Sequence, residues 1–155
     1  MFNKTDIVKL LLEHNCDPNI CNAENESPLF IASKIGKTDI VKLLIEHNCD
    51  PNIFNDKNEL SIFIASQFGH ANIVKLLLEH NCDPNICNDK NELPLFIASQ
   101  FGHANIVKLL LEHNCDPNIC NDKNESPFFI ASMFDKTDIV KLLLEHNCDP
   151  NICNV

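Results

Sequence analysis

The sequence predicts an all-α solenoid of stacked helix-turn-helix units joined by β-turn-like loops, and two observations support this class. First, a segment reading H-N-C-D-P-N-I recurs every 33 residues, so that one aspartate of it falls at Asp17, Asp50, Asp83, Asp116 and Asp149. A fixed period of this length is typical of proteins built from short stacked units. Second, the apolar pattern and the positions of Pro, Gly and Asn within each repeat predict two short helices.

The repeats divide the chain into four complete units and one partial unit. The complete units cover residues 23–55, 56–88, 89–121 and 122–154, and residues 1–22 hold the last two-thirds of another. The chain has 155 residues, of which 45% are hydrophobic, and no low-complexity linker interrupts the series. We therefore expect one continuous domain over residues 1–155, in which each unit needs its neighbours for stability.

The first helix of a unit is expected to begin at a proline, as at Pro94. Proline is tolerated at the first helical position because that amide has no intrahelical partner. Leu95 and Ala98 lie three residues apart and share one face, where the small alanine allows two helices to approach closely. Gly102 then permits the positive φ that the turn to the second helix requires.

Two units depart from this pattern in ways expected to weaken them. Ser61 replaces the proline of the first helix, so the preset φ of proline is lost at a cost of about 0.4–1 kcal/mol. Asp135 replaces the glycine of the inter-helix turn, and aspartate tolerates the left-handed region less well than glycine.

The second helix shows the pattern of an amphipathic helix of about ten residues. In the unit 56–88, Ile73, Leu76 and Leu77 fall at i, i+3 and i+4, and His80 follows at i+7, which predicts that they share the buried face. Asn81 stands just past this helix, where Asn can adopt the left-handed conformation. Helices this short are marginal in water, so packing between units must stabilise them.

The third complete unit reads L-P-L-F-I-A-S-Q-F-G-H-A-N-I-V-K-L-L-L-E-H-N-C-D-P-N over residues 93–118. In its period, its order of helices and its turn residues, it resembles the ankyrin repeat, and the resemblance extends over essentially the whole chain. The unit departs from the motif of that family where Leu93, Phe96 and Asn114 replace its Thr, its His and a Gly. The resemblance implies one helix pair in each unit and a protein-binding surface made of loop tips and first helices.

The resemblance also implies which residues contact a partner. A row of apolar side chains supports the same surface. A bulky apolar side chain precedes the inter-helix turn in every complete unit, flanked by charged loop tips, which is the composition of a protein-binding groove. The alternative is that these side chains fold back over their own helix pair. The partner-binding positions are Ala23, Glu24, Glu26, Lys34, Ile35, Asp56, Lys57, Glu59, Gln67, Phe68, Asp89, Lys90, Glu92, Gln100, Phe101, Asp122, Lys123, Glu125, Met133 and Phe134.

Composition and charge narrow the class of partner. The formal net charge is −10 and all twelve basic residues are lysines without a basic patch, so binding to nucleic acid is poorly supported. The acidic balance fits either a solvated surface or a basic partner. Since no run of 18 apolar residues exists and the start lacks a charged-then-apolar leader, we expect an intracellular, cytoplasmic protein without membrane association.

The nine cysteines fall into two registers, Cys16, Cys49, Cys82, Cys115 and Cys148 in one, and Cys21, Cys87, Cys120 and Cys153 in the other. Equivalent residues of stacked units lie on the order of 10 Å apart, whereas a disulfide needs α-carbons within about 7 Å. We therefore expect no ladder of disulfides, and thiols reduced in a reducing compartment.

Metal, cofactor and catalytic sites are not predicted. The spacing His80-x-Cys82-x4-Cys87 offers three zinc-type ligands but no fourth. A Cys-His pair recurs in every unit, but catalysis needs one constellation with a third orienting group and an oxyanion site. These residues therefore indicate no enzyme and no cofactor.

The leading hypothesis is a non-catalytic adaptor or scaffold that binds a protein of unknown identity through the concave face. The alternative is a spacer segment of a larger multi-ankyrin protein with no dedicated ligand. Because the series starts on a second helix and stops in a loop, we expect either neighbouring repeats or domains in a longer parent chain, or ends buried by self-association.

Overall fold

The computed structural model of the protein describes residues 4–152. The expected features at residues 1–3, at Cys153 and at residue 154, which ends the last unit, lie outside this range. Within it the chain forms nine α-helices and no strand. The helices are α1 (Lys4–Glu13), α2 (Pro28–Lys34), α3 (Thr38–Glu46), α4 (Ser61–Gln67), α5 (Ala71–Glu79), α6 (Pro94–Phe101), α7 (Ala104–Glu112), α8 (Pro127–Met133) and α9 (Thr137–Glu145).

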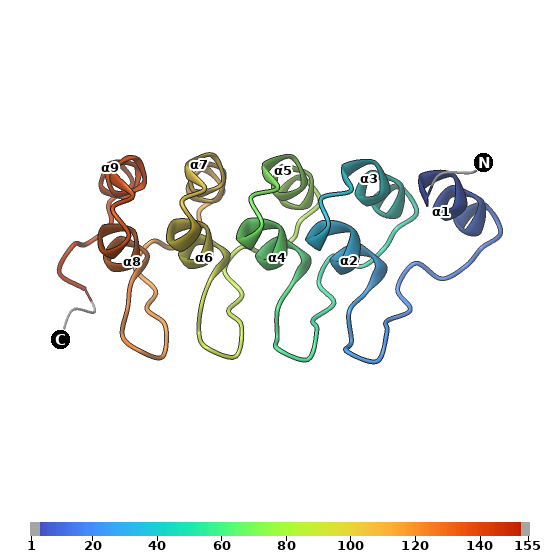
Figure 1. Ribbon diagram of the computed structural model, residues 1–155, viewed down its shortest axis with the longest axis horizontal. Helices are drawn as coiled ribbons and strands as arrows, with labels where there is room; N and C mark the ends of the chain where they lie inside the picture. The colour runs from blue at the N-terminus through green and yellow to red at the C-terminus, as the bar shows by residue number, and fades with distance from the viewer. Residues whose placement is uncertain (1–3, 153–155) are drawn as a thin grey trace.

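The helices form two rows, and this confirms the predicted all-α solenoid. Figure 1 shows α1, α3, α5, α7 and α9 side by side in one row and α2, α4, α6 and α8 in the other, with long hairpin-like loops projecting beyond the second row. Within the described residues, each helix of the second row packs on its neighbours in that row and on the helix that follows it in sequence. The hairpin loops and first helices thus share one side of the molecule.

Of the four first helices, two begin with a side-chain cap and two begin without one. The Ser27 hydroxyl accepts a hydrogen bond from the Phe30 amide at 3.1 Å, and Ser126 does the same for Phe129. Serine is among the residues preferred at this position, because its side-chain oxygen accepts from an amide that has no partner in the helix. Leu60 and Leu93 make no side-chain cap, so α4 and α6 begin without that hydrogen bond.

The turn between the two helices of a unit adopts the positive φ that its glycine predicts. Gly69 has φ 76° and Gly102 has φ 84°, and Asp135 adopts φ 54° at the equivalent position. A Cβ on Gly69 would lie 2.7 Å from the His103 ring of the next unit, so a side chain at this position would also require that ring to move. Past the second helix, Asn81 has φ 60°, as predicted.

The core runs between the two rows of helices along the whole stack. Ile73, Leu77, Leu95 and Ala98 are fully buried, as the helical periodicity predicts. His80 is the exception: it is exposed, and its Nδ1 lies 2.8 Å from the Leu76 carbonyl oxygen at the end of α5. The prediction that His80 lies on the buried face is wrong, because the ring turns back to an unpaired carbonyl of its own helix.

Candidate partner-binding groove

Each hairpin loop is held by one asparagine. In the loop before α4, the Asn55 Oδ1 accepts hydrogen bonds from the amides of Lys57 at 3.0 Å and Glu59 at 2.9 Å, and the Asn55 amide donates to the Glu59 carbonyl at 3.1 Å. Asn58 at the tip takes φ 55°, the left-handed conformation that Asn tolerates. The same bonds recur around Asn22, Asn88 and Asn121, so the loops are ordered before any partner binds.

Neighbouring hairpins are also bonded to one another. The Asp56 amide donates to the Glu24 carbonyl at 3.3 Å and the Asp89 amide to the Lys57 carbonyl at 3.2 Å. The Asp122 amide continues the series onto the carbonyl of the preceding hairpin at 3.0 Å. These bonds join the tips into one row, which reduces the ordering cost of binding along it.

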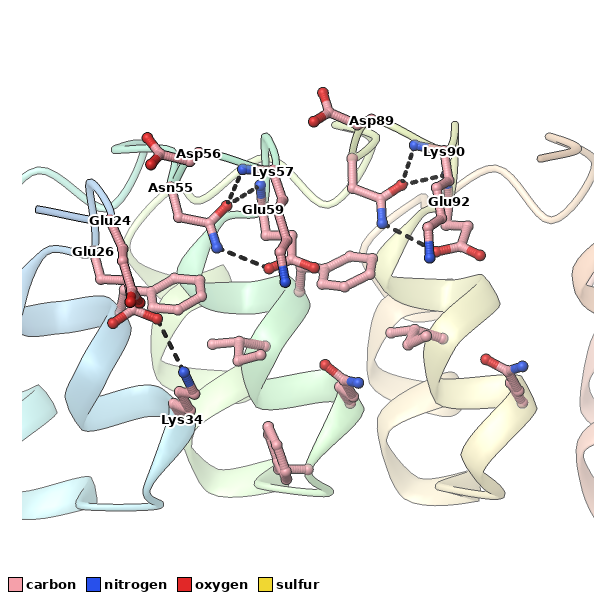
Figure 2. A pocket seen from close by; sticks show the side chains of 18 of the residues that line it. Glu24, Glu26, Lys34, Asn55, Asp56, Lys57, Glu59, Asp89, Lys90 and Glu92 are labelled. Atoms are coloured by element: carbon pink, nitrogen blue, oxygen red, sulfur yellow. Dashed lines mark hydrogen bonds and ion pairs between the residues drawn. The ribbon is translucent and has the colours of Figure 1, made fainter. Parts of the chain in front are cut away.

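A groove of about 1010 Å³ lies between this row of hairpins and the first helices, and Figure 2 shows most of its residues from close by. It draws on α2, α4 and α6 and on the hairpins before them, and it reaches the next hairpin at Lys123. Its residues are Glu24, Glu26, Phe30, Lys34, Asn55, Asp56, Lys57, Glu59, Phe63, Ile64, Gln67, Phe68, Asn88, Asp89, Lys90, Glu92, Ile97, Gln100, Phe101 and Lys123.

The groove is lined by apolar side chains from the first helices and by charged side chains from the hairpins. Phe68 and Phe101 are each 51% exposed and stand at the ends of α4 and α6. Each stacks against a histidine two residues further on, with ring centroids 6.5 Å apart for His70 and 6.4 Å apart for His103. The phenyl rings are therefore oriented by a neighbour but leave about half of their surface available for contact.

One ion pair lies inside the groove. The Lys34 Nζ donates to the Glu26 Oε1 at 2.9 Å and lies 6.0 Å from the centre of the Phe30 ring. Glu26 is buried, and its second oxygen accepts from the Asn22 side-chain amide at 3.0 Å. The Lys34 hydrogen bond holds the pKa of Glu26 below its ordinary value, and the Glu26 carboxylate raises the pKa of Lys34.

The following two units repeat the carboxylate without the lysine. Asn55 donates its side-chain amide to the Glu59 Oε2 at 2.8 Å, and the next hairpin has the same bond onto Glu92 at 3.0 Å. The position of Lys34 is taken by Gln67 and Gln100. Among the described residues, the ion pairs join neither Glu59 nor Glu92 to a lysine.

The groove brings together most of the residues that the resemblance implies. Fourteen of those named as partner-binding positions line it, and Ala23, Ile35, Asp122, Glu125, Met133 and Phe134 do not. The prediction did not include Asn55, Asn88, Phe30, Phe63, Ile64 and Ile97, which also line it. A usable signal existed for the asparagines, because Asn-x3-Glu recurs at the same position of every complete hairpin.

Cys82 and His80 bind to different partners. The Cys82 Sγ donates to the Pro51 carbonyl of the preceding unit at 3.8 Å, whereas the His80 ring faces its own helix. Burial raises the pKa of the Cys82 thiol to about 12, which disfavours the thiolate that a nucleophile needs. In the part of the chain that the structure describes, no group of three or more His, Cys, Asp and Glu could hold a metal ion.

One cysteine contradicts the expectation of reduced thiols throughout. Cys120 is disulfide-bonded, whereas Cys49, Cys82 and Cys115 are free and buried. Cys120 lies in the loop between α7 and α8.

A comparison with protein families agrees with this repeated architecture. The family model described as ankyrin repeats (3 copies) matches residues 1–88 and again residues 62–154. The chain belongs to the ankyrin-repeat family. Comparison with curated proteins finds no relative that matches it.

Membership in the ankyrin-repeat family carries a general function. Ankyrin repeats are in general protein–protein interaction modules, and their domains are typically non-catalytic. Over residues 4–152, this ankyrin-repeat chain forms no helix long and apolar enough to cross a membrane.

Proposed function

We propose that this ankyrin-repeat domain is a non-catalytic adaptor or scaffold that binds a segment of a partner protein along the concave face. The groove between the hairpin row and the first helices is the observation that carries the proposal. It runs over three helices of successive units, so it offers a long, continuous contact rather than a pocket for a small ligand. Extended surfaces of this kind are what solenoid proteins use for binding.

The chemistry of the groove supports the same conclusion. Half-exposed Phe68 and Phe101 can be desolvated by a partner, and burying an apolar side chain contributes about 1.5–3 kcal/mol. Charged hairpin residues such as Asp56 and Lys57 surround the rings and would determine specificity and the rate of association. An apolar centre with a charged rim is typical of protein interfaces.

Affinity capture from a cell lysate with matched variants tests this proposal. We compare the wild-type chain with a Phe68→Gln/Phe101→Gln variant and with Phe134→Gln, all shown to be equally helical by circular dichroism. Phe134 is 44% exposed in the same register but lies outside the groove, so it is the control. We expect the double variant to lose a partner that both other proteins retain, because only it removes apolar contacts within the groove.

The captured protein is then identified, produced separately and bound to the wild-type chain for hydrogen exchange. Added protection over residues 55–68 and 88–101 would support binding in the groove. Identical captures from all three proteins would contradict the proposal and would favour the spacer function instead.

A further inference from the structure

The same position can be compared in successive units of a repeat protein. The glutamates at one such position of the hairpins differ in whether a lysine is paired with them. In each complete unit a hairpin asparagine donates to one oxygen of the carboxylate: at Glu26, Glu59, Glu92 and Glu125. This bond orients the carboxylate and leaves its second oxygen available. Among the ion pairs of residues 4–152, only Glu26 of these glutamates receives an ammonium group on that oxygen, from Lys34.

The Lys34 ammonium shows how a cation is held at this position. Its Nζ lies 2.9 Å from the Glu26 Oε1 and 6.0 Å from the centre of the Phe30 ring, so a carboxylate and an aromatic face both attract it. In the second unit the same two groups are present as Glu59 and Phe63, and both line the groove. The lysine is replaced by Gln67, whose neutral side chain forms no ion pair.

The third unit also has glutamine in place of this lysine. In Glu59 and Glu92, the Oε2 accepts a hydrogen bond from the side-chain amide of the hairpin asparagine. No hydrogen bond among residues 4–152 reaches the Oε1 of either residue. Gln100 stands where a lysine would neutralise Glu92. Two oriented, partly exposed carboxylates therefore face the groove one unit apart, and neither forms an ion pair with a lysine of residues 4–152.

The charges around the groove favour a basic occupant over an acidic one. Six carboxylate side chains and four lysines line it, and one of these lysines, Lys34, is already paired. The other three, Lys57, Lys90 and Lys123, belong to the hairpins. The formal net charge of −10 adds a long-range attraction for cations.

We propose that the groove binds an extended, basic segment of a partner protein whose cationic side chains pair with Glu59 and Glu92, as Lys34 pairs with Glu26, while apolar side chains between them contact Phe68 and Phe101. The inference rests on the proposed function and names the chemistry of the partner. Spacing follows from the stack: neighbouring helices pack about 8–10 Å apart, and a segment in the extended polyproline II conformation rises about 3.1 Å per residue with about three residues per turn, which returns every third side chain to the same face. The two cations should therefore stand about three residues apart.

Fluorescence anisotropy with synthetic peptides tests the chemistry of the occupant. The probe is a labelled peptide with two arginines separated by a leucine and a serine, in a Gly/Ser frame, and the reference peptide has glutamate for arginine. At about 0.15 M salt, where long-range attraction is screened beyond roughly 8 Å, we expect the arginine peptide to bind at least about tenfold more tightly. Equal affinities for the two peptides would overturn the proposal.

A charge-matched pair of variants tests the site itself. Gln67→Lys/Gln100→Lys places on Glu59 and Glu92 the same internal cation that Lys34 places on Glu26, so it should compete with the peptide. Asn72→Lys/Asn105→Lys adds the same charge at exposed positions of α5 and α7, outside the groove. We expect affinity for the arginine peptide to fall at least about fivefold in the first variant and less than about twofold in the second. An equal fall in both would show general charge attraction and overturn the assigned site.

The failure of this inference is distinguishable from the failure of the proposed function. If the arginine peptide does not bind while Phe68→Gln/Phe101→Gln still abolishes capture of a partner, the groove binds proteins but not through basic side chains. If both experiments fail, the groove is not a binding surface.

Discussion

Glu26 and Lys34 form the closest ion pair among the described residues, and the only one with a buried member. The Lys9–Glu13, Lys75–Glu79 and Lys108–Glu112 pairs each have a separation of 3.9 Å between exposed side chains on one helix face. Such pairs contribute a few tenths of a kcal/mol at most. The Glu26–Lys34 pair at 2.9 Å instead joins a hairpin to α2, so it ties the wall of the groove to its helix.

Replacing Lys34 by glutamine should therefore destabilise the domain by about 0.5–1 kcal/mol near pH 7, a value kept small because Lys34 is 43% exposed. The pKa of Glu26 is lowered, so the difference is present above its ordinary value of 4.5 and is lost as the pH falls below it. The pKa of Lys34 is raised, so the difference is present below 10.5 and is lost as the pH rises above it. Urea unfolding of both proteins at pH 3, 7 and 11 measures this, with Glu26→Gln as the second arm of a double-mutant cycle. A difference that is the same at pH 3 and pH 7 would contradict the assignment.

At the scale of one element, α4 has the least favourable start among α2, α4, α6 and α8, the first helices of the complete units. It starts at Ser61 rather than proline, it lacks a side-chain cap, and the Ser61 hydroxyl is buried without a hydrogen-bond partner. Leu60 before it has φ −86° and ψ 165°, nearly the values of Leu93 before Pro94. The backbone around Ser61 is thus already in the conformation that a following proline requires.

We expect Ser61→Pro to stabilise the domain by about 1 kcal/mol. Proline would restrict the unfolded chain by about 0.4–1 kcal/mol, and it would remove the unpaired hydroxyl. The shift in the midpoint of urea unfolding measures the effect. Pro94→Ser in α6 is the matched reverse change and should destabilise by a similar amount. A less stable Ser61→Pro protein would show that the proline ring does not fit against the neighbouring units.

At the scale of the whole molecule, stability should vary along the stack. In α5, Ile73, Val74 and Leu77 are fully buried between the preceding and following units. In α1 the apolar side chains Ile7, Leu10 and Leu11 are about half exposed, at 49%, 51% and 50%. Since each unit contacts only its neighbours, the less covered helix gains less from packing.

Hydrogen exchange should show the strongest protection in α4, α5, α6 and α7 and the weakest in α1. Burial of a large apolar side chain contributes about 1.5–3 kcal/mol, so three half-exposed side chains predict an opening free energy lower by about 2–4 kcal/mol in α1 than in α5. Native-state exchange with mass spectrometry measures both values. Equal protection of α1 and α5 would show that the stack unfolds as one cooperative unit.

Much of the architecture could be predicted because the local rules and the tertiary packing agree in this chain. The period, the buried positions of α5 and the positive φ at Gly102 and Asn81 follow from spacing and from backbone sterics alone. His80 was assigned to the wrong face because periodicity cannot show that a ring at a helix end turns to a free carbonyl. The disulfide bond of Cys120 was not predicted, because the expectation of reduced thiols rested on a helix spacing and on an assumed reducing compartment.

The sequence by itself determined the type of repeat, the start of the first helix at Pro94 and the acidic character of the chain, because the first two follow from local residue patterns and the third from composition. Tertiary structure decided which of the repeated residues form one groove, and that Asn55 holds Glu59 while no lysine reaches it. The sequence shows that Gln67 and Gln100 replace Lys34, but only the folded structure shows that Lys34 pairs with Glu26. The physical reason is that an ion pair eight residues apart in sequence forms only when a hairpin folds onto its helix.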